Sequence, residues 1–265
     1  MSITSAMFTG VSGLVNNGES MNVIGNNIAN VNTVGFKYAR TLFSDMLSAN
    51  MGNNSQVGRG TQIQKIDNVF SQSSFQTSEV VTDLAMQGAS FFALGSPSAT
   101  GAQAATASYY TRAGAFRVDS DGYLVNPDGF RVLDEARTPI QFDTATFGKI
   151  TKVGSDGDIT YLDNTGAQQT YATKIGVALI PDTGSMDKVG GTLFMAGADT
   201  GITDASIAAP DGASERIFSN SLELSNVDLA TQFVNMIITQ RAYSANSKTI
   251  TTTDEMTQEV LNLKR

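Results

Sequence analysis

Few residues of this chain have the types and spacing that chemistry requires. The sequence contains no Cys, His or Trp, which excludes thiol nucleophiles, imidazole bases and zinc sites built on Cys or His. Residues 119–122 (Asp-Ser-Asp-Gly) resemble the start of a calcium loop. A complete loop needs a Glu at its twelfth position, where this chain has Phe130. We therefore interpret the segment as a hairpin turn.

Glycine-based and serine-based motifs are also missing. No phosphate cradle of the form Gly-x-x-x-x-Gly-Lys-Ser/Thr accompanies Gly184, Gly190 and Gly191, and no Gly-x-Ser-x-Gly elbow occurs. Acidic residues are scattered through predicted loops without an obvious pair in an apolar setting. The sequence predicts no catalytic residue, no cofactor and no metal ligand, and we expect a protein that is not an enzyme.

The composition narrows the possible partners. Hydrophobic residues make up 41% of the 265 residues, charged residues only 16%, and the net charge is −8. Phosphate binding needs clustered Lys and Arg, so we expect no nucleic acid partner. The first basic residue is Lys37, so the start lacks the charged region of a secretory signal. No run of about 18 apolar residues exists, and we expect no membrane insertion.

Residues 3–31 carry a heptad repeat that predicts a helix. Its main apolar stripe comprises Met7, Leu14, Met21 and Ile28, and the partner position holds Ile3, Ile24 and Val31, interrupted by Gly10 and Asn17. Each interior Gly costs a helix about 0.8–1 kcal/mol relative to Ala. Since Gly13, Gly18 and Gly25 also lie in this segment, the predicted helix needs a partner.

The C-terminal segment is the candidate partner. Residues 225–228 (Ser-Asn-Val-Asp) have the form of a capping box, and no Gly or Pro follows before Leu263. One apolar stripe comprises Leu229, Phe233, Met236, Tyr243, Ile250 and Leu261, and a second comprises Met256, Val260 and Leu263. Lys264 and Arg265 would complement the helix dipole. Two stripes allow pairing of the terminal helices alone, or further packing against other subunits, and the pattern favours the second.

Between the helices the pattern predicts a β-rich middle of short antiparallel strands. Turn signals are Asp-Gly at 121–122, 128–129 and 156–157, and Asn-Thr-Gly at 164–166. Candidate strands are 61–70, 90–95, 108–118, 130–133, 159–162, 174–180 and 192–196. We predict an exposed loop at 95–107 and linkers at 44–60 and 197–218. The predicted fold class is α+β, with long terminal helices forming a coiled-coil pair around this middle.

Distinctive strings lie, in order, at 9–14, 26–37, 68–75, 83–92, 110–116, 121–126, 225–230 and 240–248. Together these strings resemble the flagellar rod and hook protein family. Residues 134–220 match only loosely. The signature residues are Asn26, Asn27, Asn30, Gly35, Phe36, Gln240, Arg241, Ala242 and Tyr243. Within the family, residues 23–30 and 262–265 are more similar to hook protein, whereas the chain length is that of a distal rod protein.

The resemblance implies a structural subunit that assembles with itself into a helical tube. It implies a helical inner domain (1–33 and 225–265), a connecting segment (34–76 and 213–224) and a β-rich outer domain (77–212). The subunit-packing residues would be Met7, Leu14, Met21, Ile24, Ile28, Val31, Leu229, Phe233, Met236, Tyr243, Ile250 and Leu261.

The expected function is that of the extracellular flagellar hook, which transmits torque from rod to filament. The alternative is a distal rod subunit of the basal body, and a third reading is a secreted adhesin or hydrolase. The resemblance also implies other partners: other flagellar axial proteins, hook cap and junction proteins, and the type III apparatus that exports the chain without a cleaved signal.

Overall fold

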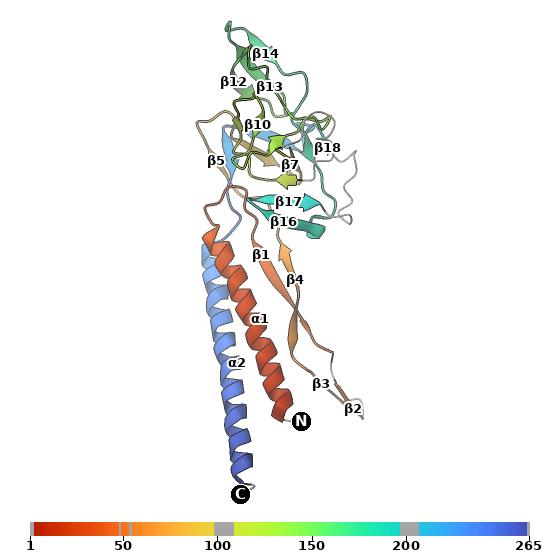
Figure 1. The fold of residues 1–265 in the computed structure, drawn as a ribbon, viewed down its shortest axis with the longest axis vertical. Coiled ribbons are helices and arrows are strands. Elements are labelled where there is room, and N and C mark those ends of the chain that lie inside the picture. Colours follow the sequence, from red (N-terminus) through yellow and green to blue (C-terminus); the bar gives the residue numbers. More distant parts are fainter. Residues whose placement is uncertain (1–2, 48, 53–54, 98–108, 197–206, 264–265) are drawn as a thin grey trace. The chain divides into compact units, whose positions relative to one another are not determined.

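The computed structural model describes residues 3–47, 49–52, 55–97, 109–196 and 207–263 (Figure 1). The chain divides into two compact units. The first, here called the helical unit, comprises Met1–Val31, Tyr38–Val69 and Val227–Arg265, and the second, the β unit, comprises Asn32–Lys37 and Phe70–Asn226. The predicted pair of long terminal helices and the central domain of short antiparallel strands are both confirmed.

Two long helices dominate the helical unit. Helix α1 spans Ile3–Ala29 and helix α2 spans Leu229–Leu263, and they lie side by side. Helix α1 ends at Ala29, within two residues of the end of the heptad segment at 3–31. None of the described helices is long and apolar enough to cross a bilayer. The prediction that Lys264 and Arg265 complement the helix dipole falls outside the described residues.

The predicted start of the second helix was wrong by about one turn. Asp228, not Ser225, caps α2: its Oδ1 accepts the backbone N–H of Ala230 at 3.0 Å and its Oδ2 accepts the Thr231 hydroxyl at 2.6 Å. These hydrogen bonds hold the pKa of the Asp228 carboxyl below its ordinary value, and the bond from the Thr231 hydroxyl has the largest effect. Ser225 is instead buried in the β unit, where its carbonyl accepts the Ser73 hydroxyl at 2.9 Å.

A β-hairpin replaces the linker predicted at 44–60. Strand β1 (Ala39–Asp45) pairs with β4 (Thr61–Asn68), and β2 (Ala49–Gly52) pairs with β3 (Ser55–Val57) between them. Polar side chains of α1 tie the hairpin down, which its linker-like composition did not reveal. Asn27 exchanges two bonds with the Ala39 backbone, at 2.8 and 3.0 Å, and Asn16 Nδ2 donates to the Thr61 carbonyl at 2.6 Å.

The β unit is organised around one strand that is buried on both sides. Among the described residues, nine strands form its main sheet, in the order β16-β17-β8-β7-β11-β10-β9, with β15 pairing β7 and β18. Successive side chains of β7 point to opposite faces: Phe92 and Leu94 join one apolar cluster, and Phe91 and Ala93 the other. The strands of this sheet are β7 (Phe91–Gly95), β8 (Tyr109–Thr111), β9 (Arg117–Val118), β10 (Leu124–Val125), β11 (Arg131–Val132), β15 (Val177–Ala178), β16 (Met186–Gly190), β17 (Leu193–Ala196) and β18 (Ile207–Ala208).

Smaller antiparallel sheets complete the described part of the β unit. They are β5–β20, β6–β19 and β12–β13–β14. A short 3-10 helix, η2 (Thr183–Ser185), precedes β16. The strand bounds are β5 (Phe75–Thr77), β6 (Leu84–Gln87), β12 (Phe147–Val153), β13 (Ile159–Asp163), β14 (Gln168–Thr170), β19 (Arg216–Ser219) and β20 (Ser221–Glu223).

The predicted turns are confirmed, and each candidate strand overlaps an observed one. The residues read as a turn at 119–122 join β9 to β10, with Gly122 at φ +79°. The candidate strand at 108–118 is interrupted between β8 and β9. The chain there presses Gly114 so closely against β6 that an added Cβ would lie 1.7 Å from the Leu84 carbonyl oxygen.

The second predicted linker, 197–218, was also wrong where it can be seen. Residues 207–208 form β18 and residues 216–219 belong to β19, which pairs with β6, so this stretch is part of the β unit. Polar residues at 211–215 form a turn, in which Asp211 Oδ1 accepts the backbone N–H groups of Ala213, Ser214 and Glu215. Residues 197–206, and 98–107 of the predicted loop, lie outside the described residues.

Candidate assembly surfaces

The face of α2 that the helical unit covers is polar. The buried side chains of α2 are Gln232, Thr239 and Thr253, and these lie at heptad spacings. Thr239 and Thr253 turn their hydroxyls back onto carbonyls one turn earlier in α2. Gln232 accepts a bond from Asn27 of α1 at 3.1 Å. Pairing of the two helices within one molecule therefore consumes little of the apolar surface of α2.

Glycines of α1 allow α2 to approach closely. A Cβ added at Gly10 would lie 3.1 Å from Ile250 Cγ1, and one added at Gly13 would lie 2.7 Å from Asn246 Nδ2. These two glycines carry a packing role in addition to weakening the isolated helix. The seam between α1 and α2 is thus narrow, and it contains small and polar residues beside Ile250.

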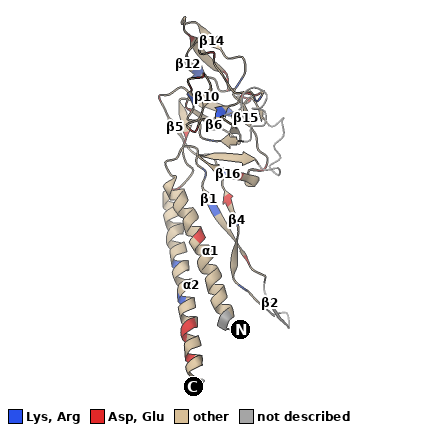
Figure 2. Cartoon of the chain, viewed as in Figure 1, with Lys and Arg blue, Asp and Glu red and all other residues tan. Residues whose placement is uncertain are grey.

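The apolar residues of both helices remain largely uncovered. Phe8 of α1 is 71% exposed and Phe233 of α2 is 50% exposed. Charged side chains are sparse on both helices (Figure 2), and α1 carries only Glu19. We call the following set the helical apolar surface: Met7, Phe8, Val11, Val15, Leu229, Phe233, Val234, Ile237, Ile238, Tyr243, Met256, Val260, Leu261 and Leu263.

The hairpin carries a second exposed apolar group. Leu47 is 90% exposed, and Leu42, Phe43, Met46 and Ile66 are each more than a third exposed. Burial of a large apolar side chain is worth about 1.5–3 kcal/mol. Exposure on this scale is typical of surfaces at which a protein binds a partner.

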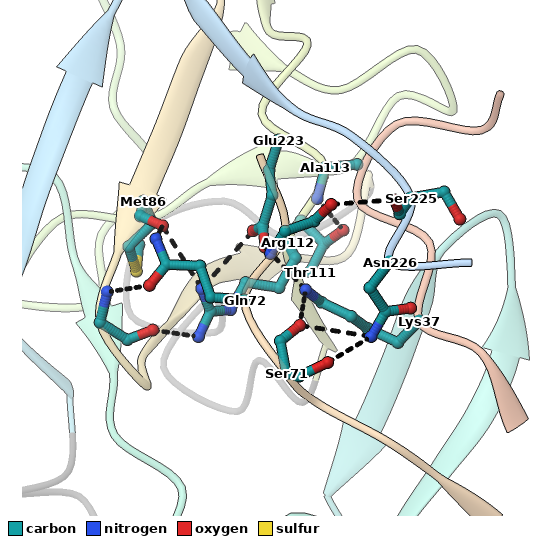
Figure 3. A network of polar contacts seen from close by, with 12 residues as sticks. Lys37, Ser71, Gln72, Met86, Thr111, Arg112, Ala113, Glu223, Ser225 and Asn226 are labelled. Carbon is teal, nitrogen blue, oxygen red and sulfur yellow. Dashed lines mark hydrogen bonds and ion pairs between the residues drawn. The ribbon is translucent and has the colours of Figure 1, made fainter. Parts of the chain in front are cut away.

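Ionic groups in the β unit form one buried cluster, drawn in Figure 3. Lys37 Nζ lies 2.7 Å from Glu223 Oε1, and Arg112 Nη1 lies 3.5 Å from Glu223 Oε2. The side chains of Lys37 and Glu223 are 1% and 0% exposed, and that of Arg112 is 2% exposed. We call these three residues the Glu223 cluster.

Backbone groups complete the environment of this cluster. Lys37 Nζ also donates to the Ser71 carbonyl at 2.8 Å, and Arg112 Nη2 donates to the Gly88 carbonyl at 2.6 Å. The Ser73 N–H donates to Glu223 Oε1 at 3.0 Å. Burial lowers the pKa of both Lys37 and Arg112 and outweighs the opposing effect of the Glu223 charge. One carboxylate thus serves two buried cations.

A deep pocket that holds two carboxylates of perturbed pKa would favour the alternative that this chain is a hydrolase. The buried carboxylates among the described residues are Asp134 and Glu223, and both have structural partners. Asp134 accepts bonds from Thr138 and Thr173, whereas Glu223 is paired with Lys37 and Arg112. In the described part of the chain, no group of three or more acidic side chains is placed to hold a metal ion.

Comparison with known proteins identifies the family. Full-length similarity is found to the flagellar basal-body rod protein FlgG of Bacillus subtilis, which is 37% identical over 98% of this chain and 99% of the relative. The chain belongs to the flagellar rod and hook family. Three models of this family match: the basal body rod protein model at residues 7–37, the hook protein FlgE/F/G D1 domain at 85–161, and the FlgEFG protein C-terminal model at 219–263.

Other relatives separate rod from hook. The FlgG protein of Caulobacter vibrioides is 31% identical over 98% of this chain and 99% of its own length. The hook protein FlgE of Treponema pallidum is 43% identical, but over only 48% of this chain and 28% of the hook protein. The chain is therefore a structural, non-enzymatic protein of the flagellar axis, and its family implies polymerisation with other axial proteins.

The family signature residues have different structural positions. Asn27 is buried between α1, the hairpin and α2, whereas Asn30 Nδ2 donates to the Asn26 carbonyl at the end of α1. Phe36 is buried in the β unit, and Gly35 adopts φ +67° beside Ala113, where a side chain would not fit. The remaining signature residues lie along α2: Gln240, Arg241 and Tyr243 are exposed and Ala242 is half-buried.

The residues predicted to pack between subunits divide into two groups. Ile24 is buried, and Leu14, Met21, Ile28, Val31, Met236 and Ile250 are half-buried within the single chain. Exposed and available to other chains are Met7, Leu229, Phe233, Tyr243 and Leu261.

Sequence reasoning missed several surface and cluster residues. Val234, Ile237 and Ile238 could have been found, because they form a second apolar ridge beside Phe233 of the chosen stripe. No local signal pairs Lys37 with Glu223, which lies 186 residues further along the chain.

Proposed function

We propose that this chain is a subunit of the distal rod of the flagellar basal body, which assembles with copies of itself into a straight tube. The observation that carries the proposal is similarity to rod proteins over nearly the whole chain. The relatives named as hook proteins match only about half of it. The hook function expected from the chain ends is therefore the weaker reading.

The hairpin supports the same choice. An ordered connecting segment at about 38–60 that packs between neighbours is the feature expected to distinguish a stiff shaft from a flexible hook. Residues 39–68 form β1 to β4, held to α1 by Asn16 and Asn27, and the hairpin carries exposed Phe43, Met46 and Leu47. In the proposed tube, these side chains pack against adjacent subunits and restrict sliding.

The helical apolar surface has the matching role in the tube wall. In the proposed assembly the domain at 1–33 and 225–265 forms the inner wall, segments 34–76 and 213–224 connect, and 77–212 lies outside. Copies bury the helical apolar surface through a heterologous contact repeated along the axis. Export of the unfolded chain by the type III apparatus, and contact with other rod proteins and hook subunits, belong to the same proposal.

Electron microscopy of the purified chain under polymerising conditions tests this function. Straight tubes are expected for a rod subunit. Curved tubes would support the hook as the second candidate, which the 43% identity to a hook protein over part of the chain favours. Absence of polymer at every salt and protein concentration would refute both.

A further inference from the structure

The chain passes between its two units at four points, and the residues beside these points meet in the β unit. The passages follow Val31, Lys37, Val69 and Asn226. Two segments are here called the root segments: residues 32–37, which follow α1, and residues 223–226, which precede α2. Both root segments, together with residues 71–73, lie around the Glu223 cluster (Figure 3).

Direct hydrogen bonds join the two root segments. The Gly35 N–H donates to the Glu223 carbonyl at 2.8 Å, and the Asn226 N–H donates to the Phe36 carbonyl at 3.4 Å. Both involve only the backbone, so they hold the segments in one register. The buried pair of Lys37 and Glu223 adds a side-chain link across the same two segments.

The third segment is bound to both of the others. Ser71 accepts Lys37 Nζ and, through its carbonyl and hydroxyl oxygens, Asn226 Nδ2 at 3.3 and 3.0 Å. The Ser73 hydroxyl donates to the Ser225 carbonyl at 2.9 Å. A cation also covers the first root segment, since Lys188 Nζ lies 4.2 Å from the centre of the Phe36 ring. Every contact in this arrangement is internal to the β unit.

The helix seam, in contrast, offers little to hold the chain ends together. It contains glycines and polar side chains beside Ile250, and many large apolar residues of the two helices, such as Phe8 and Phe233, remain exposed. Pairing α1 with α2 from free chain ends would close a loop of about 200 residues, at an entropic cost that grows with the logarithm of loop length. If the root segments are already joined, the helices start from adjacent points and pair at high effective concentration.

We propose that the Glu223 cluster is an anchor that holds the two root segments together in the single molecule, whether or not α1 and α2 are paired. Because of this anchor, α1 and α2 can separate and pair again without the entropic cost of closing the loop of about 200 residues between them. The inference rests on the proposed function only in taking the helices to be fully covered in the assembled tube. Its test uses the monomer, so failure of the anchor and failure to form tubes are separate results.

Hydrogen exchange of single amides in the full-length monomer, read by NMR, tests the anchor. Two variants separate its causes: Lys37→Met removes the ion pair, and Ala245→Pro breaks α2 in its middle, because proline removes a helix bond and clashes with the preceding turn. A matched control, Lys174→Met, removes an ion pair with Asp156 that is exposed on the β unit.

We expect Ala245→Pro to speed exchange throughout α2 and to leave the Gly35 and Asn226 amides protected as in the parent. Lys37→Met should speed exchange at these two amides at least tenfold, with β7 amides unchanged, and Lys174→Met should change neither. The anchor is refuted if the Gly35 amide loses protection when α2 is broken, since the root segments would then depend on the helices. It is equally refuted if Lys37→Met leaves both root amides as slow as in the parent.

Discussion

Replacing Glu223 should destabilise the β unit much more than replacing Lys37, although the two side chains face each other at 2.7 Å. The reason is the count of charges, since one carboxylate neutralises two buried cations. Glu223→Gln keeps the shape of the side chain and removes the anion that both cations contact. Lys37→Met keeps most of the volume and leaves Arg112 with its partner Glu223.

The magnitudes follow from what each change leaves behind. Removing one partner of a buried ion pair costs about 3–5 kcal/mol, because an uncompensated charge remains in the interior. Lys37→Met removes the buried ammonium group and leaves Glu223 paired with Arg112, and burial already lowers the pKa of Lys37. Both acceptors keep a donor, since Ser73 still binds Glu223 and Asn226 still binds Ser71. Its expected cost is that of lost hydrogen bonds, about 1–2 kcal/mol.

Urea unfolding followed by tyrosine fluorescence measures these costs, because Tyr110 is buried in the β unit. With a slope of about 2 kcal/mol per molar urea, the midpoint should fall by about 1.5–2.5 M for Glu223→Gln and by about 0.5–1 M for Lys37→Met. The exposed control Lys174→Met should leave the midpoint unchanged. A Lys37→Met midpoint as low as that of Glu223→Gln would show that the charge-count reasoning is wrong.

Three further predictions concern the surfaces and turns. Phe233→Ala should raise the critical concentration for assembly about thirtyfold, because about 2 kcal/mol of apolar burial is lost, whereas Ser244→Ala on the same helix should leave it unchanged. Sedimentation measures the critical concentration of both variants, and an unchanged value for Phe233→Ala would exclude this side chain from the interface. Gly114→Ala should destabilise the β unit by about 3 kcal/mol or more, since its Cβ would meet the Leu84 carbonyl; near-parent thermal unfolding would contradict the fold there. The Asp211 carboxyl has a pKa of about 2, below its ordinary 3.8, mainly because the Ser214 hydroxyl binds it, so its contribution to stability is full above pH 4 and is lost as the pH falls toward 2. The free energy of unfolding of Asp211→Asn should therefore fall less steeply with decreasing pH than that of the parent, and equal slopes of the two proteins would contradict this.

The sequence predicted the elements of this fold better than the faces they use. The heptads located both long helices, and Asp-Gly pairs located the turns, because both signals are local. The apolar stripe of α2, Phe233 among it, was predicted to pack between subunits and is exposed in the single chain at Phe233, whereas the polar face with Gln232, Thr239 and Thr253 that the chain itself covers gave no signal. A subunit that assembles encodes faces for its neighbours as well as for itself, and periodicity alone cannot separate the two.

Other features depended on contacts between distant parts of the chain. Residues 44–60 have a linker-like composition, whereas the hairpin to which they belong is held in place by Asn16 and Asn27 of α1. Capping by Asp228 in place of Ser225 follows from the burial of Ser225 in the β unit. The Glu223 cluster joins residues separated by most of the chain, so neither spacing nor composition could indicate it.

In the proposed tube, the helical apolar surface becomes the contact between copies of this chain. Hydroxyl-radical footprinting of Phe8 and Phe233, in the monomer and in the assembled tube, measures it most directly. Both side chains are at least half exposed in the single chain, so they should react in the monomer and become protected in the tube, while a residue outside the surface, such as Tyr123 of the β unit, serves as reference. Tubes in which Phe8 and Phe233 react as fast as in the monomer would show that the helical apolar surface is not the contact between copies.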